Sequence, residues 1–235
     1  MLILAIESTT EACSVALYKQ GDIVELFDIA PRQHTNLLLN RVDSLLKQND
    51  VSKQSLDAIA YCRGPGAFTG LRITTGVAQG LAFGLNIPLI AISSLAALTQ
   101  GAYRINQKNN ATNKLFNYLP CLDARKSEVF WGFYTVKDGY ASAINDEQVS
   151  SVEALSNAIS QYQPASQKWQ VVGTASEIIK KINEPSLIYV DSSLETINYP
   201  QAYDVAFLAA KEFELGNTID VEQAVPVYLR NNVTF

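Results

Sequence analysis

Apolar and polar residues alternate with the period of a β-strand through the first part of the chain. A continuous apolar run at residues 2–6 is typical of a strand buried on both faces. The period-2 alternation of residues 12–19 predicts a second strand. A turn at 20–22 leads to a third strand at 23–29, which Pro31 ends. The chain is therefore predicted to open with a three-stranded meander.

Helical spacing replaces this alternation after the meander. Leu38, Val42 and Leu45 recur at i, i+4 and i+7, so they predict a helix over residues 34–48 with one buried stripe. The remaining elements of the first half are expected to be a strand at 56–62, a helix at 71–85, a strand at 88–92 and a helix from an N-cap at Ser93 to residue 106. This order combines an antiparallel edge with parallel crossovers and predicts an α/β fold.

The second half has a weaker pattern of the same kind. A polar, Asn-rich segment at 108–114 indicates a linker, which divides the chain into residues 1–107 and 115–235. Strands are expected at 116–122, 128–136, 170–172 and 187–190, and helices at 152–160, 175–181 and 204–215. The second half could be a degenerate repeat of the first, although no repeat is visible residue by residue.

Composition narrows the class of protein. The chain has 235 residues, 48% of them hydrophobic, with 18 Lys and Arg against 23 Asp and Glu. Such a chain can bury a core and is not disordered. The longest apolar tract, residues 76–92, is broken by Gln79, Asn86 and Pro88, so we expect no membrane span. Three scattered cysteines fit reduced thiols in a cytoplasmic protein.

The chain has a single histidine, His34. Metal sites that need two histidines are therefore excluded, and a zinc site would have to be rich in carboxylates. A nucleophile–histidine site would depend on His34, and the chain has no GxSxG motif. We interpret His34 as a surface or helix-capping residue.

A glycine-rich stretch, residues 64–70, lies between a predicted strand and a predicted helix. Backbone N–H groups at such a place can bind an anion. Its spacing fits neither a Walker A loop nor GxGxxG. Gly64, Gly66, Thr69 and Gly70 are therefore candidate residues of an anion or nucleotide loop, and the alternative is a tight turn with positive φ at Gly64 or Gly66.

Gly76, Gly80 and Gly84 lie on one face of the helix that follows. Each glycine costs about 1 kcal/mol relative to alanine inside a helix. A close backbone approach would offset that cost. Two kinds of contact are equally compatible with the spacing: packing inside the chain, and an interface with another subunit.

Several segments resemble the TsaB (YeaZ) family. They are LAIESTT at 4–10, CSVAL at 13–17, GPGAFTGLR at 64–72, SSLA at 93–96, DAR at 123–125 followed by EVF at 128–130, and PVYLR at 226–230. They occur in family order from one end of the chain to the other. The chain is thus identified as similar to this family over its whole length.

The resemblance implies the actin-like ATPase fold, with two lobes that each have a βββαβα core, the first lobe binding partners. It implies a non-catalytic subunit required for N6-threonylcarbamoyladenosine (t6A) at position 37 of tRNAs that read codons beginning with A. The subunit would be a scaffold and activator of the TsaD transferase. The implied partners are TsaD as a heterodimer, the TsaE ATPase and a second copy as a homodimer, with tRNA bound indirectly. No cofactor would be bound tightly, while the complex uses ATP.

The resemblance also assigns expectations to individual residues. The TsaD paralogue holds a metal with an HxxxH pair and an Asp, whereas His34 is followed four residues later by Leu38. Glu7 stands where the family commonly has Asp, and we expect it to hydrogen-bond locally around residues 8–10. We therefore expect neither catalytic nor metal-binding residues.

The family associates through helices of the first lobe. The partner or dimer interface is therefore expected to contain Leu37, Arg41, Ser44, Gly76, Gly80 and Gly84. The last helix is expected to be able to pack on the first lobe.

Three other functions are compatible with parts of the sequence. One is an M22 glycoprotease-like peptidase, which the single histidine disfavours. Another is a small-molecule kinase of the actin superfamily, for which residues 172–175 would be a remnant loop. A third is direct tRNA binding, but the basic residues are dispersed: Arg63 and Arg72 flank the glycine-rich stretch, and Arg125 and Lys126 form a small pair in a turn.

Overall fold

The three predicted N-terminal strands form an antiparallel meander. In the computed structural model, which describes residues 1–108, 117–162, 168–189 and 195–230, these strands are β1 (Leu2–Glu7), β2 (Ala12–Lys19) and β3 (Asp22–Ile29). β2 lies between the other two and pairs with β1 and β3 along its whole length. All three predicted strands are confirmed to within two residues.

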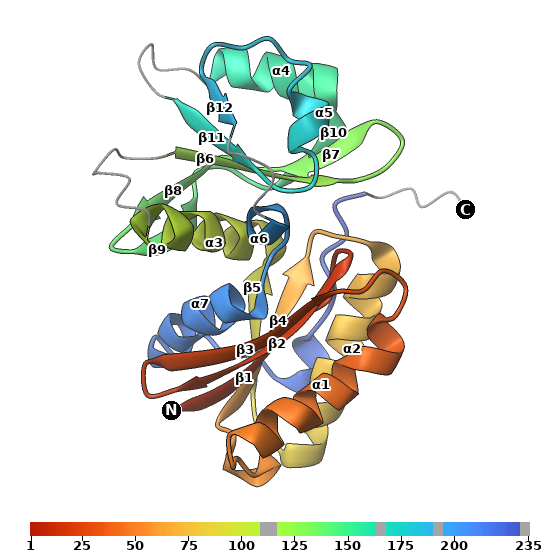
Figure 1. Ribbon diagram of the computed structural model, residues 1–235, viewed down its shortest axis with the longest axis vertical. Coiled ribbons are helices and arrows are strands. Elements are labelled where there is room, and N and C mark those ends of the chain that lie inside the picture. Colours follow the sequence, from red (N-terminus) through yellow and green to blue (C-terminus); the bar gives the residue numbers. More distant parts are fainter. Residues whose placement is uncertain (109–116, 163–167, 190–194, 231–235) are drawn as a thin grey trace. The chain divides into compact units, whose positions relative to one another are not determined.

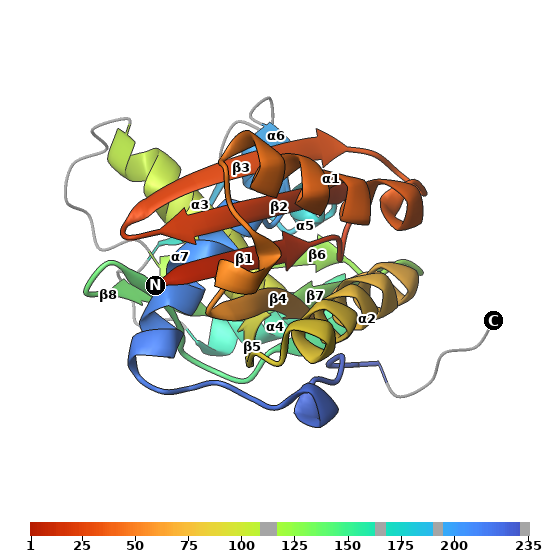
Figure 2. The same ribbon diagram turned by 90° about the horizontal axis from the view of Figure 1, so that it is seen from below.

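Two parallel strands complete the first sheet. β4 (Ala58–Gly64) pairs with β1, and β5 (Leu89–Ser93) pairs with β4, which gives the order β3-β2-β1-β4-β5. Helices α1 (His34–Gln48) and α2 (Phe68–Leu85) cover one face, and α7 (Ala202–Glu214) covers the other (Figures 1 and 2). The predicted stripe of Leu38, Val42 and Leu45 is buried in the core under α1.

The second sheet repeats the topology of the first. Its five main strands are β6 (Asn117–Asp123), β7 (Glu128–Trp131), β10 (Gln148–Ser151), β11 (Trp169–Val172) and β12 (Leu187–Tyr189). Their order, β10-β7-β6-β11-β12, combines two antiparallel pairs with two parallel pairs, as in the first sheet. Helices α4 (Val152–Gln161) and α5 (Ser176–Ile179) follow β10 and β11. The duplicated βββαβα order is that of the actin-like ATPase fold, so the suggested repeat is confirmed at the level of topology.

Part of the second half differs from the prediction. The single strand expected at 128–136 is wrong, because the chain leaves β7 at Gly132 and begins β8 (Tyr134–Lys137) two residues later. Between them the Phe133 N–H donates to the Asn145 side chain at 2.7 Å instead of to a neighbouring strand. β8 forms a hairpin with β9 (Tyr140–Ala143). Neither β9 nor β10 was predicted, and the short elements η1 (Lys53–Ser55), α6 (Glu195–Asn198) and η2 (Val221–Gln223) were missed too.

The chain forms two compact units whose limits differ from the predicted ones. The first contains residues 1–97 and 200–227, and the second contains 98–199 and 228–235. Helix α3 (Ser94–Lys108) supplies residues to both units, so the division falls inside a helix that was assigned to the first half. The predicted linker at 108–114 lies outside the described residues except for its first residue.

The last helix belongs to the first unit because its N-terminus is held by the meander. The Ala202 N–H donates to Ser14 Oγ at 2.8 Å, and the Tyr203 N–H donates to Glu25 Oε1 at 3.0 Å. The predicted N-cap of α3 is also present, since Ser93 Oγ accepts from the N–H groups of Leu95 and Ala96.

Candidate functional site

The glycine-rich stretch packs directly on the turn between β1 and β2. A Cβ atom added to Gly66 would lie 2.4 Å from the carbonyl oxygen of Thr9, and one added to Gly70 would lie 2.2 Å from that of Ser8. The Ala67 N–H donates to the same Thr9 oxygen at 2.7 Å. Only glycine permits so close an approach of two backbones. These two glycines are therefore required by contacts within the chain.

Gly64 is the glycine of this stretch that adopts the predicted positive φ, at 111°. An added Cβ would lie 2.9 Å from the Val227 carbonyl oxygen, and the Val227 N–H donates to the Arg63 carbonyl oxygen at 2.8 Å. Thr69 is exposed in the first turn of α2. The chain's own backbone thus accounts for all three glycines of the candidate loop, and an anion-binding role of the loop stays a prediction.

A buried polar cluster joins this turn to the helices around it. Glu7 Oε1 accepts hydrogen bonds from the Thr9 N–H at 2.9 Å and from Thr9 Oγ1 at 2.7 Å, so the expected local bonding of Glu7 is confirmed. The hydroxyl groups of Thr9 and Ser94 lie 3.1 Å apart, and those of Ser8 and Thr74 lie 2.6 Å apart. The turn after β1 is therefore tied by side chains to α2 and to the first residue of α3.

Complete burial raises the pKa of the Glu7 carboxyl from 4.5 to about 7. Hydrogen bonds from the Thr9 and Cys62 side chains and from the backbone at Thr9 and Ser8 oppose this shift by favouring the charged form. A carboxyl in this environment holds its proton more tightly than an exposed one. Its hydrogen bonds to Thr9 hold the turn after β1 in place.

His34 is a core residue, which corrects its interpretation as a surface or capping side chain. It is only 9% exposed, and its Nε2 lies 3.1 Å from the Ala12 carbonyl oxygen, while Gln33 occupies the N-cap position of α1. Leu38, four residues later, is fully buried. Within the described residues, no three His, Cys, Asp or Glu side chains gather in a way that would hold a metal ion.

The glycine strip of α2 faces away from the rest of the first unit. Gly76, Gly80 and Gly84 are exposed, and a Cβ added to any of them would meet no atom within 4 Å. The alternative of packing inside the chain is therefore wrong for the described residues. The strip leaves a smooth surface on which the backbone of α2 can be approached closely.

Sequence reasoning missed an aromatic residue on the same surface. Phe83 is 74% exposed, and it follows Gly80 by three residues on the face that carries the strip. Arg72 is the only charged residue in the 18 residues of α2. The missed signal was the spacing of Phe83 from the glycines. We define Gly76, Gly80, Phe83 and Gly84 as the α2 face.

The residues predicted on α1 are only half-buried and have contacts within the first unit. Arg41 forms an ion pair with Asp28 at 2.7 Å, and Leu37 packs partly against the core. Ser44 is half-buried as well. Leu39, which was not predicted, is more open, at 49% exposed. Arg41 faces β3, and Leu37 and Ser44 share its side of α1, whereas Leu39 lies on the other side of the buried stripe of this helix.

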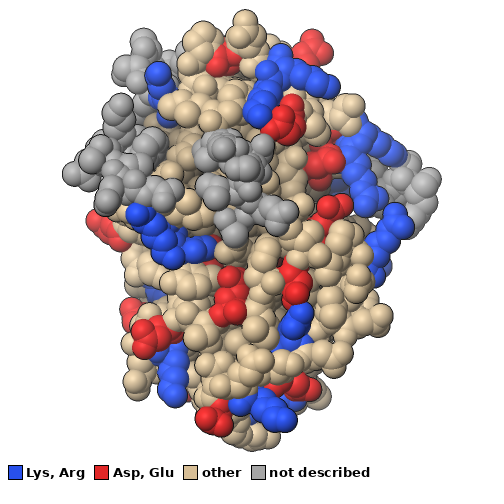
Figure 3. Space-filling model, viewed as in Figure 1, with Lys and Arg blue, Asp and Glu red and all other residues tan. Residues whose placement is uncertain are grey.

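Charge is mixed over the surface. Figure 3 shows basic and acidic side chains interspersed on the face drawn, with no continuous basic band there. In the described part of the chain, no helix is long and apolar enough to cross a membrane.

Comparison with known proteins identifies the family. The family model described as "TsaD: tRNA N6-adenosine threonylcarbamoyltransferase" matches residues 27–234. The chain is 39% identical to the tRNA threonylcarbamoyladenosine biosynthesis protein TsaB of Escherichia coli, over 100% of this chain and 97% of that protein. The chain belongs to the TsaB family. The TsaB protein of Haemophilus influenzae is 34% identical over 100% of this chain and 96% of its own length.

A solved structure of the family has the same fold. YeaZ from Pseudomonas aeruginosa is 37% identical, with a TM-score of 0.85, and the match covers 97% of this chain and 99% of that one. The tRNA N6-adenosine threonylcarbamoyltransferase of Legionella pneumophila is 34% identical over 116 residues, which is 41% of this chain and 34% of that protein. This chain and that transferase are therefore similar in sequence over a stretch of 116 residues.

We predict that alanine has opposite effects at two glycines of α2. Gly70→Ala should lower the free energy of unfolding by about 2 kcal/mol, because the new Cβ collides with the Ser8 carbonyl oxygen. Gly76→Ala should raise it by up to about 1 kcal/mol, because the added methyl meets no atom and favours the helix. Urea denaturation followed by circular dichroism measures both. Equal effects at the two positions would contradict the packing described for the loop.

We predict that Glu7 makes stability depend on pH. Since the folded pKa of about 7 exceeds the ordinary 4.5, the folded state binds the proton more tightly, and stability is lost as pH rises between these values. The loss amounts to roughly 3 kcal/mol above pH 7. Glu7→Gln cannot ionise, so its unfolding free energy relative to wild type should increase from pH 5 to pH 8.

Glu11→Gln is the matched control, because Glu11 is exposed and lies in the same turn. Its difference from wild type should be the same at pH 5 and pH 8. If the difference in unfolding free energy between Glu7→Gln and wild type is also the same at pH 5 and pH 8, the proton-binding role of this carboxyl is contradicted.

Proposed function

We propose that this chain is the non-catalytic subunit of a complex that forms t6A at position 37 of tRNAs reading codons that begin with A. It acts as a scaffold and activator of the TsaD transferase, together with the TsaE ATPase. Its membership of the TsaB family, whose curated members are named tRNA threonylcarbamoyladenosine biosynthesis proteins, supports this role. We further propose that the chain works in the cytoplasm, since its proposed substrate is tRNA.

The observation that carries the proposal is the α2 face. An exposed strip of three glycines beside a 74% exposed phenylalanine is costly in a helix that only covers its own sheet. A partner helix would turn both features to use, because the glycines admit its backbone and the phenylalanine fills a pocket on it. Low charge and an aromatic anchor are typical of the centre of a protein interface. We propose that TsaD binds here, and that a second copy of the chain binds here when TsaD is absent.

The residues of the first unit support a role without catalysis. His34 bonds to the backbone of β2, and the position that would supply a second histidine is filled by buried Leu38. Glu7 is enclosed and bonded to Thr9. We therefore propose that the chain holds no tightly bound cofactor, and that the ATP used by the complex is bound by other subunits.

These contacts disfavour the two enzymatic alternatives. A peptidase of the M22 type needs a metal site or a histidine free to act as a base, and His34 is engaged in the core. A kinase needs two phosphate loops whose backbone is open to the nucleotide, whereas both candidate loops of this chain pack against its own backbone. The glycine-rich stretch packs on the turn after β1, and an added Cβ at Gly173 would lie 2.1 Å from the Cys121 carbonyl oxygen.

We predict that substitutions on the α2 face separate folding from assembly. Gly80→Leu blocks close approach of a partner, and Phe83→Asp removes the aromatic anchor and places a charge at the contact. Each should weaken binding to TsaD and self-association more than tenfold, and t6A formation should fall in parallel. Analytical ultracentrifugation and a reconstituted modification assay measure these effects, while circular dichroism verifies that the variants fold.

Leu215→Asp is the matched control, because Leu215 is a 61% exposed apolar residue of the same unit at the end of α7. It should leave assembly and modification unchanged. If Gly80→Leu and Phe83→Asp also bind TsaD with wild-type affinity, the α2 face is not the interface.

A further inference from the structure

A segment near the end of the first unit runs alongside α2. Ile219 pairs with Leu89 at the start of β5, through two N–H···O bonds of 2.8 and 2.9 Å. Farther along the chain, the Val227 N–H donates to the carbonyl oxygen of Arg63 near the end of β4. Helix α2 connects the same two strands, so the segment passes it in the opposite direction (Figure 2). We call residues 219–227 the strap.

Gln79 of α2 holds the strap in place. Its Nε2 donates to the carbonyl oxygens of Val221 at 3.2 Å and of Ala224 at 2.9 Å, and Ala224 is buried in the core of the unit. Gln79 follows Gly76 by three residues and precedes Phe83 by four, and residues at these spacings are neighbours on a helix. The strap therefore borders the α2 face on the side of Gln79.

The strap exposes an apolar side chain at this border. Val225 follows Ala224 directly and is 62% exposed. Among the described large apolar residues of the first unit, only Phe83, Leu215 and Val225 are more than 60% exposed. Leu215 lies at the end of α7, on the opposite face of the sheet. The other two thus lie on the glycine strip or beside it, which makes one apolar surface from two segments far apart in the sequence.

The charge of the strap indicates which partner suits this surface. Asp220 and Glu222 are exposed, and residues 219–227 contain no Lys or Arg. A symmetric pair of identical chains would bring two such straps to one interface. Like charges brought together at an interface discriminate against that partner. The strap therefore favours a different protein with basic residues over a second copy of this chain.

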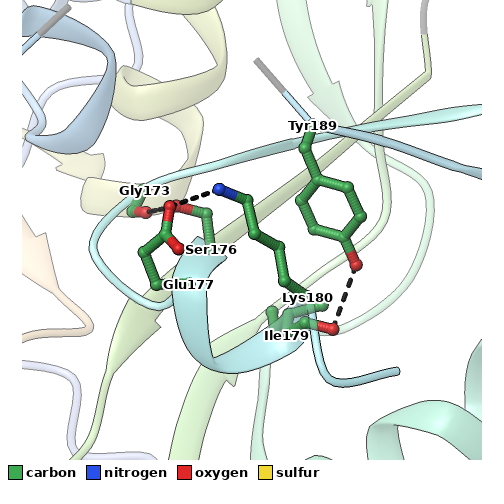
Figure 4. Close-up of polar contacts among 6 residues, drawn as sticks. All are labelled: Gly173, Ser176, Glu177, Ile179, Lys180 and Tyr189. Atoms are coloured by element: carbon green, nitrogen blue, oxygen red, sulfur yellow. Dashed lines mark hydrogen bonds and ion pairs between the residues drawn. The ribbon is translucent and has the colours of Figure 1, made fainter. Parts of the chain in front are cut away.

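The equivalent helix of the second unit has a different kind of surface. α5 is four residues long, and its exposed side chains Glu177 and Lys180 form an ion pair. Figure 4 shows this pair and the Lys180 side chain beside the ring of Tyr189. A charged surface of this kind is typical of a protein region that stays in water. The apolar surface described above therefore has no counterpart on α5.

We propose that the strap is part of the TsaD-binding site. One helix of TsaD lies on the glycine strip, its apolar side chains contact Phe83 and Val225, and its basic side chains face Glu222. This inference rests on the proposed function, since it takes TsaD as the partner of the α2 face. It adds the chemistry of the partner, an amphipathic helix with Lys or Arg along one edge. Gln79 is a positioning residue that keeps the strap on α2.

The first test compares two exposed apolar residues of the same unit. Val225→Asp should weaken binding to full-length TsaD about tenfold or more, because it places a charge in an apolar contact. Leu215→Asp is matched in exposure, at 61%, and should bind as wild type does. Isothermal titration calorimetry measures both affinities, and circular dichroism verifies folding. A folded Val225→Asp variant with wild-type affinity would overturn the proposal.

The second test uses the charge of the strap. Glu222→Lys should weaken TsaD binding and strengthen self-association, each by about threefold or more at low salt, and both effects should shrink as salt is added. Glu214→Lys is the control, because Glu214 is an exposed residue of α7 and its substitution changes the net charge equally. It should alter neither equilibrium. Changes of the same sign in both equilibria for Glu222→Lys would contradict the proposed charge pairing.

The third test examines the positioning role of Gln79. Gln79→Ala removes the two hydrogen bonds to the strap, so it should weaken TsaD binding in the wild-type chain and have little further effect in Val225→Asp. Additive effects would mean that Gln79 does not act through the strap.

Failure of this inference is distinguishable from failure of the proposed function. If Gly80→Leu and Phe83→Asp weaken TsaD binding and Val225→Asp does not, the strap is not part of the site, while the α2 face still is. If none of these variants affects binding, the α2 face itself is not the interface.

Discussion

The first unit depends on a contact between two stretches of backbone. The turn after β1 and the glycine-rich stretch at the start of α2 approach each other so closely that a methyl group added at Gly66 or Gly70 would collide with the backbone of the turn. This contact sets where α2 begins. Glu7, Thr9 and Ser94 reinforce it with a chain of buried hydrogen bonds. With its start fixed in this way, α2 buries one face on the sheet and leaves the glycine strip and Phe83 outside.

The second unit uses the same device with a different result. Gly173, with a φ of 109°, approaches the carbonyl oxygen of Cys121 in β6, much as Gly70 approaches the carbonyl oxygen of Ser8 directly after β1. The helix that follows is only four residues long, whereas α2 has eighteen. Only the first of these two equivalent helices can offer a long face to a partner. The two units therefore share one topology but differ in their surfaces, because the helix at this equivalent position differs in length.

Much of this architecture could be predicted from the sequence where burial imposes a clear period. Helix α1 was predicted with its observed bounds because Leu38, Val42 and Leu45 form one apolar stripe. The local bonding of Glu7 was predictable from the hydroxyl groups that follow it. The strands β8, β9 and β10 were not predicted correctly because they are four residues long and only partly buried, which is too short for a period to emerge.

The candidate site shows where such reasoning stops. The spacing of three glycines predicts that they share a face, but glycine has no side chain whose polarity tells whether that face is inside or outside. Phe83 was missed because an aromatic residue in an apolar helix is normally expected in the core. His34 was misplaced because its partner, the Ala12 carbonyl oxygen, lies on another element 22 residues away.

The central claim is that this chain is required for t6A formation without performing the chemistry. An omission experiment tests it most directly, with TsaD, TsaE, the enzyme that supplies threonylcarbamoyl-AMP, ATP, threonine, bicarbonate and tRNA, and with t6A measured by mass spectrometry. The account predicts that t6A forms only when the chain is present, and that the chain produces none in the absence of TsaD. Equal t6A formation with and without the chain, using cognate partners, would contradict it.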